Sequence, residues 1–315
     1  MHHFKQFTHQ VGIEAVGGPN AFENFIAALQ GRMDKPALFG WFHLLCLGLM
    51  FACCVWIVCR RKTLTEKKVD LIMGITASVM ICFEIYKQLV FSYQGNGTWT
   101  YQWYIFPFQF SSTPMYVMLV GALVKNKTVK NACRCFMATY GLFAGAAVMF
   151  YPGDVFQGMI GINIQTMLHH GIMFVVGVML YASGIVKMRP KSAIPALPIF
   201  FILLTIATIL NIAIYPIIEG DPAQAFNMFY ISPYYPCTLP LLSMFANKIP
   251  YILFFFIYAL GFTGLAFLMP CIALGVSKLF GLISLGISKL FALFAPKKAE
   301  EPAPQSSENS ANNAE

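Results

Sequence analysis

Long apolar runs separated by short polar stretches dominate the chain. A helix needs about 20 apolar residues to cross the ~30 Å hydrocarbon core of a bilayer. Runs of that length occur at residues 37–59, 69–93, 102–124, 132–151, 162–186, 193–216 and 249–274. The pattern predicts an all-α polytopic membrane protein, a seven-transmembrane-helix bundle that leaves no room for a large soluble domain.

The segments that flank the predicted bundle have different patterns. Residues 1–36 contain Phe22, Phe25, Ile26 and Leu29 at helical spacing, so we expect a short interfacial helix there. The pattern of residues 275–298 predicts an amphipathic interfacial helix, and the alternative is an eighth span. Residues 299–315 are polar, and we expect a disordered cytoplasmic tail.

Composition and charge agree with the membrane class and suggest an orientation. Hydrophobic residues make up 58% of the chain and charged residues 11%, against about 25% charged in soluble domains. Lysine and arginine gather in the connections after the first, third and fifth runs, which predicts an outside N-terminus and a cytoplasmic C-terminus in a multi-pass protein of the cell membrane. The net charge of +8 follows from these loops, so we expect lipid and no nucleic acid as partner.

The nine cysteines do not suggest a disulfide framework or a metal site. Most fall in predicted spans, and Cys237 is alone in the outer loops, so it has no outer partner within the chain. Cys133 and Cys135 form a C-x-C pair without a second group of ligands. We therefore expect packing cysteines, no metal and no cofactor.

Unusual polar residues gather at one predicted depth. Counting ~1.5 Å per residue from each outer end places them roughly 5 to 15 Å below the outer surface. They are His43, Glu84, Lys87, Gln109, Ser111, Ser112, Gln165, His169, His170 and Asn211. The inner halves of the same runs are almost purely apolar, so the layer indicates a site in the outer half of the bundle.

Charge and proline positions in this layer suggest a cavity wall. Glu84 and Lys87 share a helix face at i,i+3 and should face inward, either as part of a site or as a structural ion pair. Pro114 should kink the third span beside Ser111, because it frees the carbonyl of Phe110. Broken backbone at membrane depth is tolerated beside protein or a wet cavity. A kink used for packing alone is the alternative.

The same layer contains the groups needed for nucleophilic chemistry. A serine hydroxyl is inert until a base removes its proton, and histidine is the usual base. Ser111 is the candidate nucleophile, with His169 as base, His170 as substitute base and Glu84 as the carboxylate that orients the imidazole. A lone interior histidine is more often a structural donor than a catalyst.

Four stretches of the chain resemble a known family. They are WYIFPFQFSS, MLHHGIMF, LNIAIYPIIEGDPAQAFNMFYISPYYP and NKIPYILFFFIYAL, and in this order they are similar to YwaF-like integral membrane proteins of bacteria. That family resembles in turn a eukaryotic transmembrane acyltransferase of ether phospholipids, which uses a cysteine and a histidine. The resemblance implies that Ser111 stands at the cysteine position and His169 at the histidine position. Serine is the weaker nucleophile, which leaves a serine hydrolase or loss of catalysis open.

We therefore expect a lipid-acyl transferase or acyl hydrolase that takes a phospholipid or acyl donor. Its candidate substrate-binding residues are His43, Lys87, Gln109, Ser112, Gln165, Asn211 and Asn227. The alternatives are a transporter or proton-coupled binding protein that uses Glu84, Lys87 and the histidines, and a seven-span sensor.

Overall fold

The computed structural model describes residues 18–218, 224–246 and 248–294 of the 315. Residues up to Leu274 form one compact unit, and those from Gly275 onward form a second. Residues 1–17 and the predicted tail 299–315 lie outside the described residues.

Within the described ranges, six helices are long and apolar enough to cross a membrane. They are Trp41–Thr63, Glu66–Ser92, Lys127–Phe150, Ile160–Ala182, Pro190–Ile217 and Tyr251–Ile287, and Thr113–Leu123 is a shorter apolar helix. Each long helix begins within five residues of a predicted run. An all-α membrane protein is thereby supported, and the third predicted span is the one that differs.

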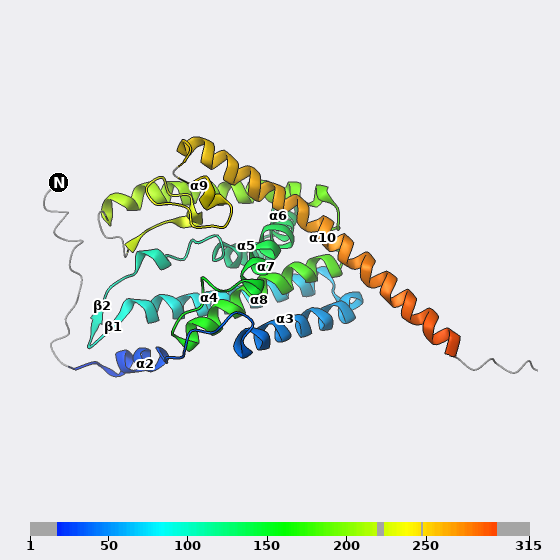
Figure 1. Ribbon diagram of the computed structural model, residues 1–315, viewed down its shortest axis with the longest axis horizontal. Helices are drawn as coiled ribbons and strands as arrows, with labels where there is room; N and C mark the ends of the chain where they lie inside the picture. The colour runs from blue at the N-terminus through cyan, green and yellow to red at the C-terminus, as the bar shows by residue number, and fades with distance from the viewer. Residues whose placement is uncertain (1–17, 219–223, 247, 295–315) are drawn as a thin grey trace, which may run out of the picture. The chain divides into compact units, whose positions relative to one another are not determined.

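The helices of the first unit lie side by side (Figure 1). They are α3 (Trp41–Arg60), α4 (Glu66–Ser92), α5 (Thr113–Leu123), α6 (Lys127–Phe136), α7 (Leu142–Phe150), α8 (Ile160–Ala182), α9 (Leu197–Ile214) and the first part of α10 (Tyr251–Phe294). One π-helical stretch, η3 (Met137–Gly141), joins α6 to α7. Short 3₁₀ segments are η1 (Arg61–Thr63), η2 (Trp103–Ile105), η4 (Pro190–Ala196), η5 (Tyr215–Ile217), η7 (Met228–Tyr230) and η8 (Leu242–Met244).

The third predicted span is half irregular, so the prediction of one kinked helix over 102–124 is wrong. Residues 103–112, called here the irregular segment, form η2 and a series of backbone turns. Helix α5 begins only at Thr113, with Pro114 in its first turn. Proline is tolerated there because the first N–H groups of a helix have no intrahelical acceptor. The carbonyl of Phe110 is not left free, because the Thr113 hydroxyl donates to it at 3.1 Å.

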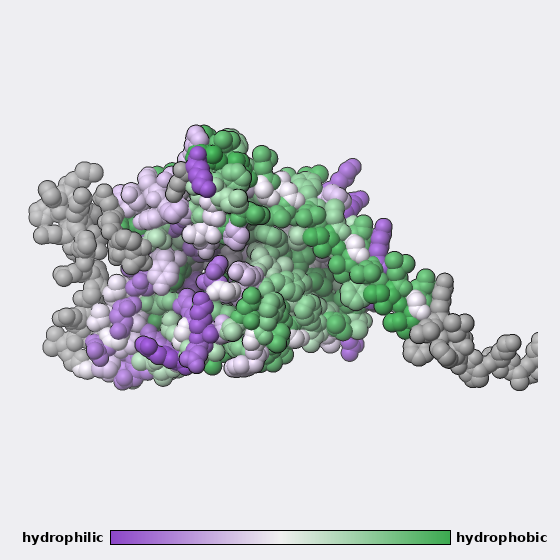
Figure 2. Space-filling view, in the orientation of Figure 1, coloured by the Kyte–Doolittle hydropathy of each residue, from purple (hydrophilic) through white to green (hydrophobic). Residues whose placement is uncertain are grey.

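One end of this unit, which we call the α2 end, holds the small elements of the fold. These are α2 (Ala21–Leu29) and a hairpin of β1 (Tyr93–Gly95) and β2 (Thr98–Trp99). Asn20 and Glu23 form a reciprocal cap at the start of α2, and Trp99 donates to Glu23 at 3.1 Å. Hydrophilic residues gather over this end in Figure 2, whereas the neighbouring surface of the helices is largely hydrophobic.

The opposite end carries the basic connections and is called here the lysine-rich end. Arg134 of α6 is 6% exposed and lies between two carboxylates of α4, 2.7 Å from Asp70 and 3.0 Å from Glu66. Lys130 adds a 2.6 Å contact to Asp70. Two acids therefore balance two bases, and the network joins the start of α4 to α6.

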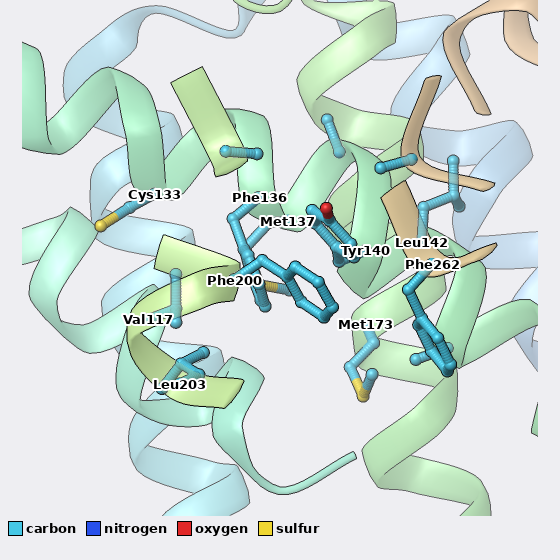
Figure 3. Close-up of a cluster of buried hydrophobic side chains, with 14 of the residues drawn as sticks. Val117, Cys133, Phe136, Met137, Tyr140, Leu142, Met173, Phe200, Leu203 and Phe262 are labelled. Atoms are coloured by element: carbon cyan, nitrogen blue, oxygen red, sulfur yellow. The ribbon is translucent and has the colours of Figure 1, made fainter. Parts of the chain in front are cut away.

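The apolar core fills the bundle between these ends (Figure 3). Tyr140 stacks on Phe200 with ring centroids 4.5 Å apart, and Phe262 of α10 stacks on Tyr258 at 4.4 Å. Helices α7 and α8 touch at Gly145, where a Cβ atom would lie 2.7 Å from backbone atoms of His170 and Phe174. The stacked rings fill the middle of the bundle, and the contact at Gly145 brings α7 against α8 beside the polar layer.

The C-terminal helix also departs from the predicted boundaries. We expected span seven to end at 274 before a separate interfacial helix, but α10 continues without a break to Phe294 and contains Pro270. In the second unit, taken by itself, the large apolar side chains from Val276 to Ile287 are exposed. Nothing in that stretch of the sequence marks a helix end, because its Ser, Gly and Lys residues are compatible with a continuing helix.

Candidate functional site

Helix α4 brings three polar side chains to the α2 end. Lys87 Nζ lies 2.8 Å from Glu84 Oε1, as their i,i+3 spacing predicts, and both side chains are largely buried. Gln88 donates at 2.8 Å to the same Glu84 oxygen and also at 2.8 Å to the carbonyl of Ile105. One amide therefore orients the carboxylate and also holds the irregular segment against α4.

The irregular segment presents Gln109, Ser111 and Ser112 beside α4 and α8. Gln109 donates its amide to the carbonyl of Tyr104 at 3.2 Å, and Ser112 is 3% exposed. The Ser111 carbonyl lies 3.0 Å from His169 Nε2. The structure therefore brings Ser111 and His169 together, through the serine backbone.

The hydrogen bonds of α8 define which nitrogen of each histidine carries the proton. A carbonyl oxygen only accepts, so His169 Nε2 must donate to Ser111 and His170 Nδ1 must donate to the Thr166 carbonyl 2.7 Å away. His169 Nδ1 and His170 Nε2 are then unprotonated nitrogens in the neutral rings. Both histidines are buried, at 3% and 6% exposed.

Several buried acceptors in this region have no partner among the described residues. They are Glu84 Oε2, Gln88 Oε1, Gln109 Oε1, His169 Nδ1 and His170 Nε2. Buried polar atoms are normally hydrogen-bonded, and exceptions occur at sites that bind a ligand, an ion or water. All five are acceptors, so a group bound here would offer hydrogen-bond donors.

Three residues predicted to bind substrate instead hold the backbone. His43 accepts from the Phe39 N–H and lies 2.8 Å from the Met149 carbonyl. Asn211 pairs with both backbone groups of Met228, at 2.7 and 3.0 Å. Asn227 bonds backbone groups within its own loop. Each of these side chains therefore has a structural role in the fold, and its part in binding substrate stays a prediction.

Gln165 is also buried, but it stays close to its own helix. Its side-chain oxygen accepts from the Thr166 hydroxyl at 3.4 Å, and it is 5% exposed. Among the residues that the structure describes, no group of three or more histidine, cysteine, aspartate or glutamate side chains is placed to hold a metal ion.

A comparison with protein families now places the chain. A model of the TMEM164 family, a family of transmembrane proteins, matches residues 38–275. The chain belongs to the TMEM164 family. The chain has no match among the curated proteins and none among the solved structures. The matched range includes the whole polar layer, from His43 to Asn211, and ends in α10.

Sequence reasoning missed two features of this TMEM164-family protein. Gln88 was not predicted, although its i,i+4 spacing from Glu84 is a visible signal. Apart from Asn227, no residue of the loop between α9 and α10 was assigned to the site. In the structure, Phe229 of this loop packs on Phe108 and Phe110, with centroids 6.0 and 5.3 Å apart.

Proposed function

We propose that this multi-pass membrane protein of the TMEM164 family acts on lipid acyl groups in the cell membrane, as an acyltransferase or acyl hydrolase. Ser111 is the nucleophile in this proposal and His169 the base, with His170 as the substitute. The observation that carries it is the 3.0 Å hydrogen bond from His169 Nε2 to the Ser111 carbonyl, which holds the His169 ring, with its buried and unpartnered Nδ1, beside the serine segment.

The reaction follows from these groups. The Ser111 oxygen attacks the ester carbonyl of the acyl donor while its proton passes to a histidine nitrogen. The C–O bond to the leaving alcohol then breaks, and the histidine returns the proton to that oxygen. An acyl-serine remains, and attack by a lipid hydroxyl or by water releases it. Lys87 and the Gln109 amide are the candidates to stabilise the developing oxyanion.

The packing of the bundle favours this proposal over transport. A transporter needs a path from the polar layer to the opposite side of the membrane. The core of Figure 3 fills that route with buried Phe136, Tyr140, Phe200 and Phe262. A site closed on one side suits chemistry on a lipid that enters from the membrane.

The test is covalent labelling with a fluorophosphonate that carries an alkyl chain. Purified wild-type protein should form an adduct that mass spectrometry places on Ser111, and Ser111→Ala should abolish it. His169→Ala should slow labelling by about 10²-fold or more, as the loss of a general base does. Ser111→Cys should transfer reactivity to alkylating reagents, because a thiolate is the stronger nucleophile.

Ser183→Ala is the matched control, because its hydroxyl only bonds back to the Leu180 carbonyl at 3.2 Å. It should label like the wild type. An adduct on another residue, or equal labelling of Ser111→Ala and Ser183→Ala in folded protein, would refute the proposal.

A further inference from the structure

A groove runs along the outside of the bundle between α4 and α5, away from the polar layer. It is an open groove of about 710 Å³, lined among others by Asp70, Gly74, Ser78 and Cys82 of α4 and by Ala122 and Leu123 of α5. Sites for drug-sized ligands occupy about 300 to 1,000 Å³. The groove exists because α4 presents small residues at every fourth position, opposite the small Ala122.

The groove is lined mainly by apolar side chains, and its polar groups already have hydrogen-bond or ion-pair partners within the protein. The Ser78 hydroxyl is already bonded to the Gly74 carbonyl at 3.0 Å. Leu71 and Leu123, which also line the groove, are 63% and 72% exposed. In a membrane these surfaces meet lipid tails, so the ligand that fits the groove is an acyl chain.

Positive charge at one end of the groove favours a lipid with a negatively charged head group. Asp70 lies at the lysine-rich end, and its carboxylate is neutralised by Lys130 and Arg134 at 2.6 and 2.7 Å. Lys67 is one turn before Asp70 and Leu71 on the same face of α4, and Lys125 and Lys127 directly follow the groove-lining end of α5.

These three lysines are exposed, and none forms an ion pair with another part of the chain that the structure describes. The entrance of the groove is therefore positively charged, while the acid nearest to it is already paired. We propose that the α4–α5 groove binds an anionic phospholipid, with one acyl chain in the groove and its phosphate beside Lys67, Lys125 and Lys127. This site is independent of the Ser111 chemistry.

The test is native mass spectrometry of the full-length protein in mild detergent, titrated with phosphatidylglycerol or with phosphatidylcholine of the same acyl chains. The wild type should retain phosphatidylglycerol preferentially. Replacing the three lysines by glutamine should weaken phosphatidylglycerol binding about tenfold or more and remove the preference, since each lysine near a lipid surface contributes to binding anionic lipid.

A second variant tests the groove itself. A Cβ on Gly74 would lie 3.4 Å from the Ala122 Cβ, an ordinary contact, so the rest of a leucine side chain must enter the groove. Gly74→Leu should therefore lose the bound lipid. Gly48→Leu on α3 is the matched control, because Gly48 is exposed and a Cβ added there would have no neighbouring atom within 4 Å.

The matched charge control replaces Lys62, Lys187 and Lys191, three other exposed lysines of the basic connections. Equal losses in the two triple variants would overturn the proposal, because they would show a general charge effect. Unchanged lipid binding by folded Gly74→Leu would also overturn the proposal. A change in the fraction of dimer alone would overturn it too, because that result would assign the groove to a second copy of the chain. If Gly74→Leu does not fold, Ala122→Leu fills the same space.

Discussion

Asn211 is predicted to hold the α9–α10 loop closed over the irregular segment. Its side chain is fully buried, accepts from the Met228 N–H at 2.7 Å and donates to the Met228 carbonyl at 3.0 Å. Directly after Met228, Phe229 and Tyr230 both have φ near +60°, at 60° and 57°. Non-glycine residues in this region cost about 1 to 3 kcal/mol each, and such strain persists only where the surroundings fix it.

The magnitude of the effect follows from these contacts. Asn211→Ala leaves the buried Met228 N–H without a partner, at about 1 to 3 kcal/mol. It also removes one of two donors to the Met228 carbonyl, which keeps the Ile231 N–H at 3.4 Å. Local opening of the loop should thus become easier by about 2 kcal/mol or more, which corresponds to at least about 30-fold in the open population. Relaxation of the two strained residues acts in the same direction.

Cys237 reports this opening. It lies in the same loop, is 4% exposed, and burial raises the pKa of its thiol. Maleimide labelling at Cys237, followed by peptide mass spectrometry, should be slow in the wild type and at least about 30-fold faster in Asn211→Ala. Because the thiolate reacts, the raised pKa delays labelling of the wild type to higher pH, and the variant should label at lower pH.

The control is Thr205→Ala on the same helix, whose hydroxyl bonds only to the Phe201 carbonyl at 2.8 Å. It should label like the wild type. Equal Cys237 labelling rates in Asn211→Ala and Thr205→Ala would contradict the role given to Asn211.

Two further predictions concern stability. Asp70→Asn should destabilise the fold by about 3 kcal/mol, because Arg134 stays buried with only the exposed Glu66 as partner; a thermal midpoint equal to that of Lys127→Gln would argue against this. Gly145→Ala should cost about 1 to 3 kcal/mol, since its Cβ would press on backbone atoms of α8 at 2.7 Å. Gly171→Ala is the control, as its nearest neighbour is the flexible Met149 sulfur at 3.7 Å, and matching melting curves for the two glycine variants would refute the argument.

The sequence predicted long helices well and broken backbone poorly. Length and apolar composition are enough to locate α4 or α8, since a helix satisfies its own backbone hydrogen bonds. Hydropathy over 102–124 is equally high, but it does not reveal that the N–H and carbonyl groups before Thr113 find partners outside a helix. The continuation of α10 past Leu274 was missed for a related reason, because an interfacial helix and a continuing one share the same local pattern.

The composition of the polar layer was predictable, whereas the roles within it were not. Glu84, Lys87 and His169 stand out as costly residues in a span, and the structure places them near the α2 end with Ser111. Asn211 carries the same signal, but its partner is Met228, 17 residues later in an irregular loop. No spacing rule identifies such a partner, so a structural asparagine and a site residue look alike in the sequence.

The half-irregular stretch at 102–124 has a consequence for how the protein is made. Some of its backbone and side-chain hydrogen bonds come from distant residues, with Gln88 bonded to Ile105 and Gln224 accepting from the Trp103 N–H at 2.9 Å. Gln224 is synthesised 121 residues after Trp103. Until that part of the chain has been synthesised, the segment lacks its partner for this amide. Folding of residues 102–124 should therefore be completed late and should depend on the segments that follow.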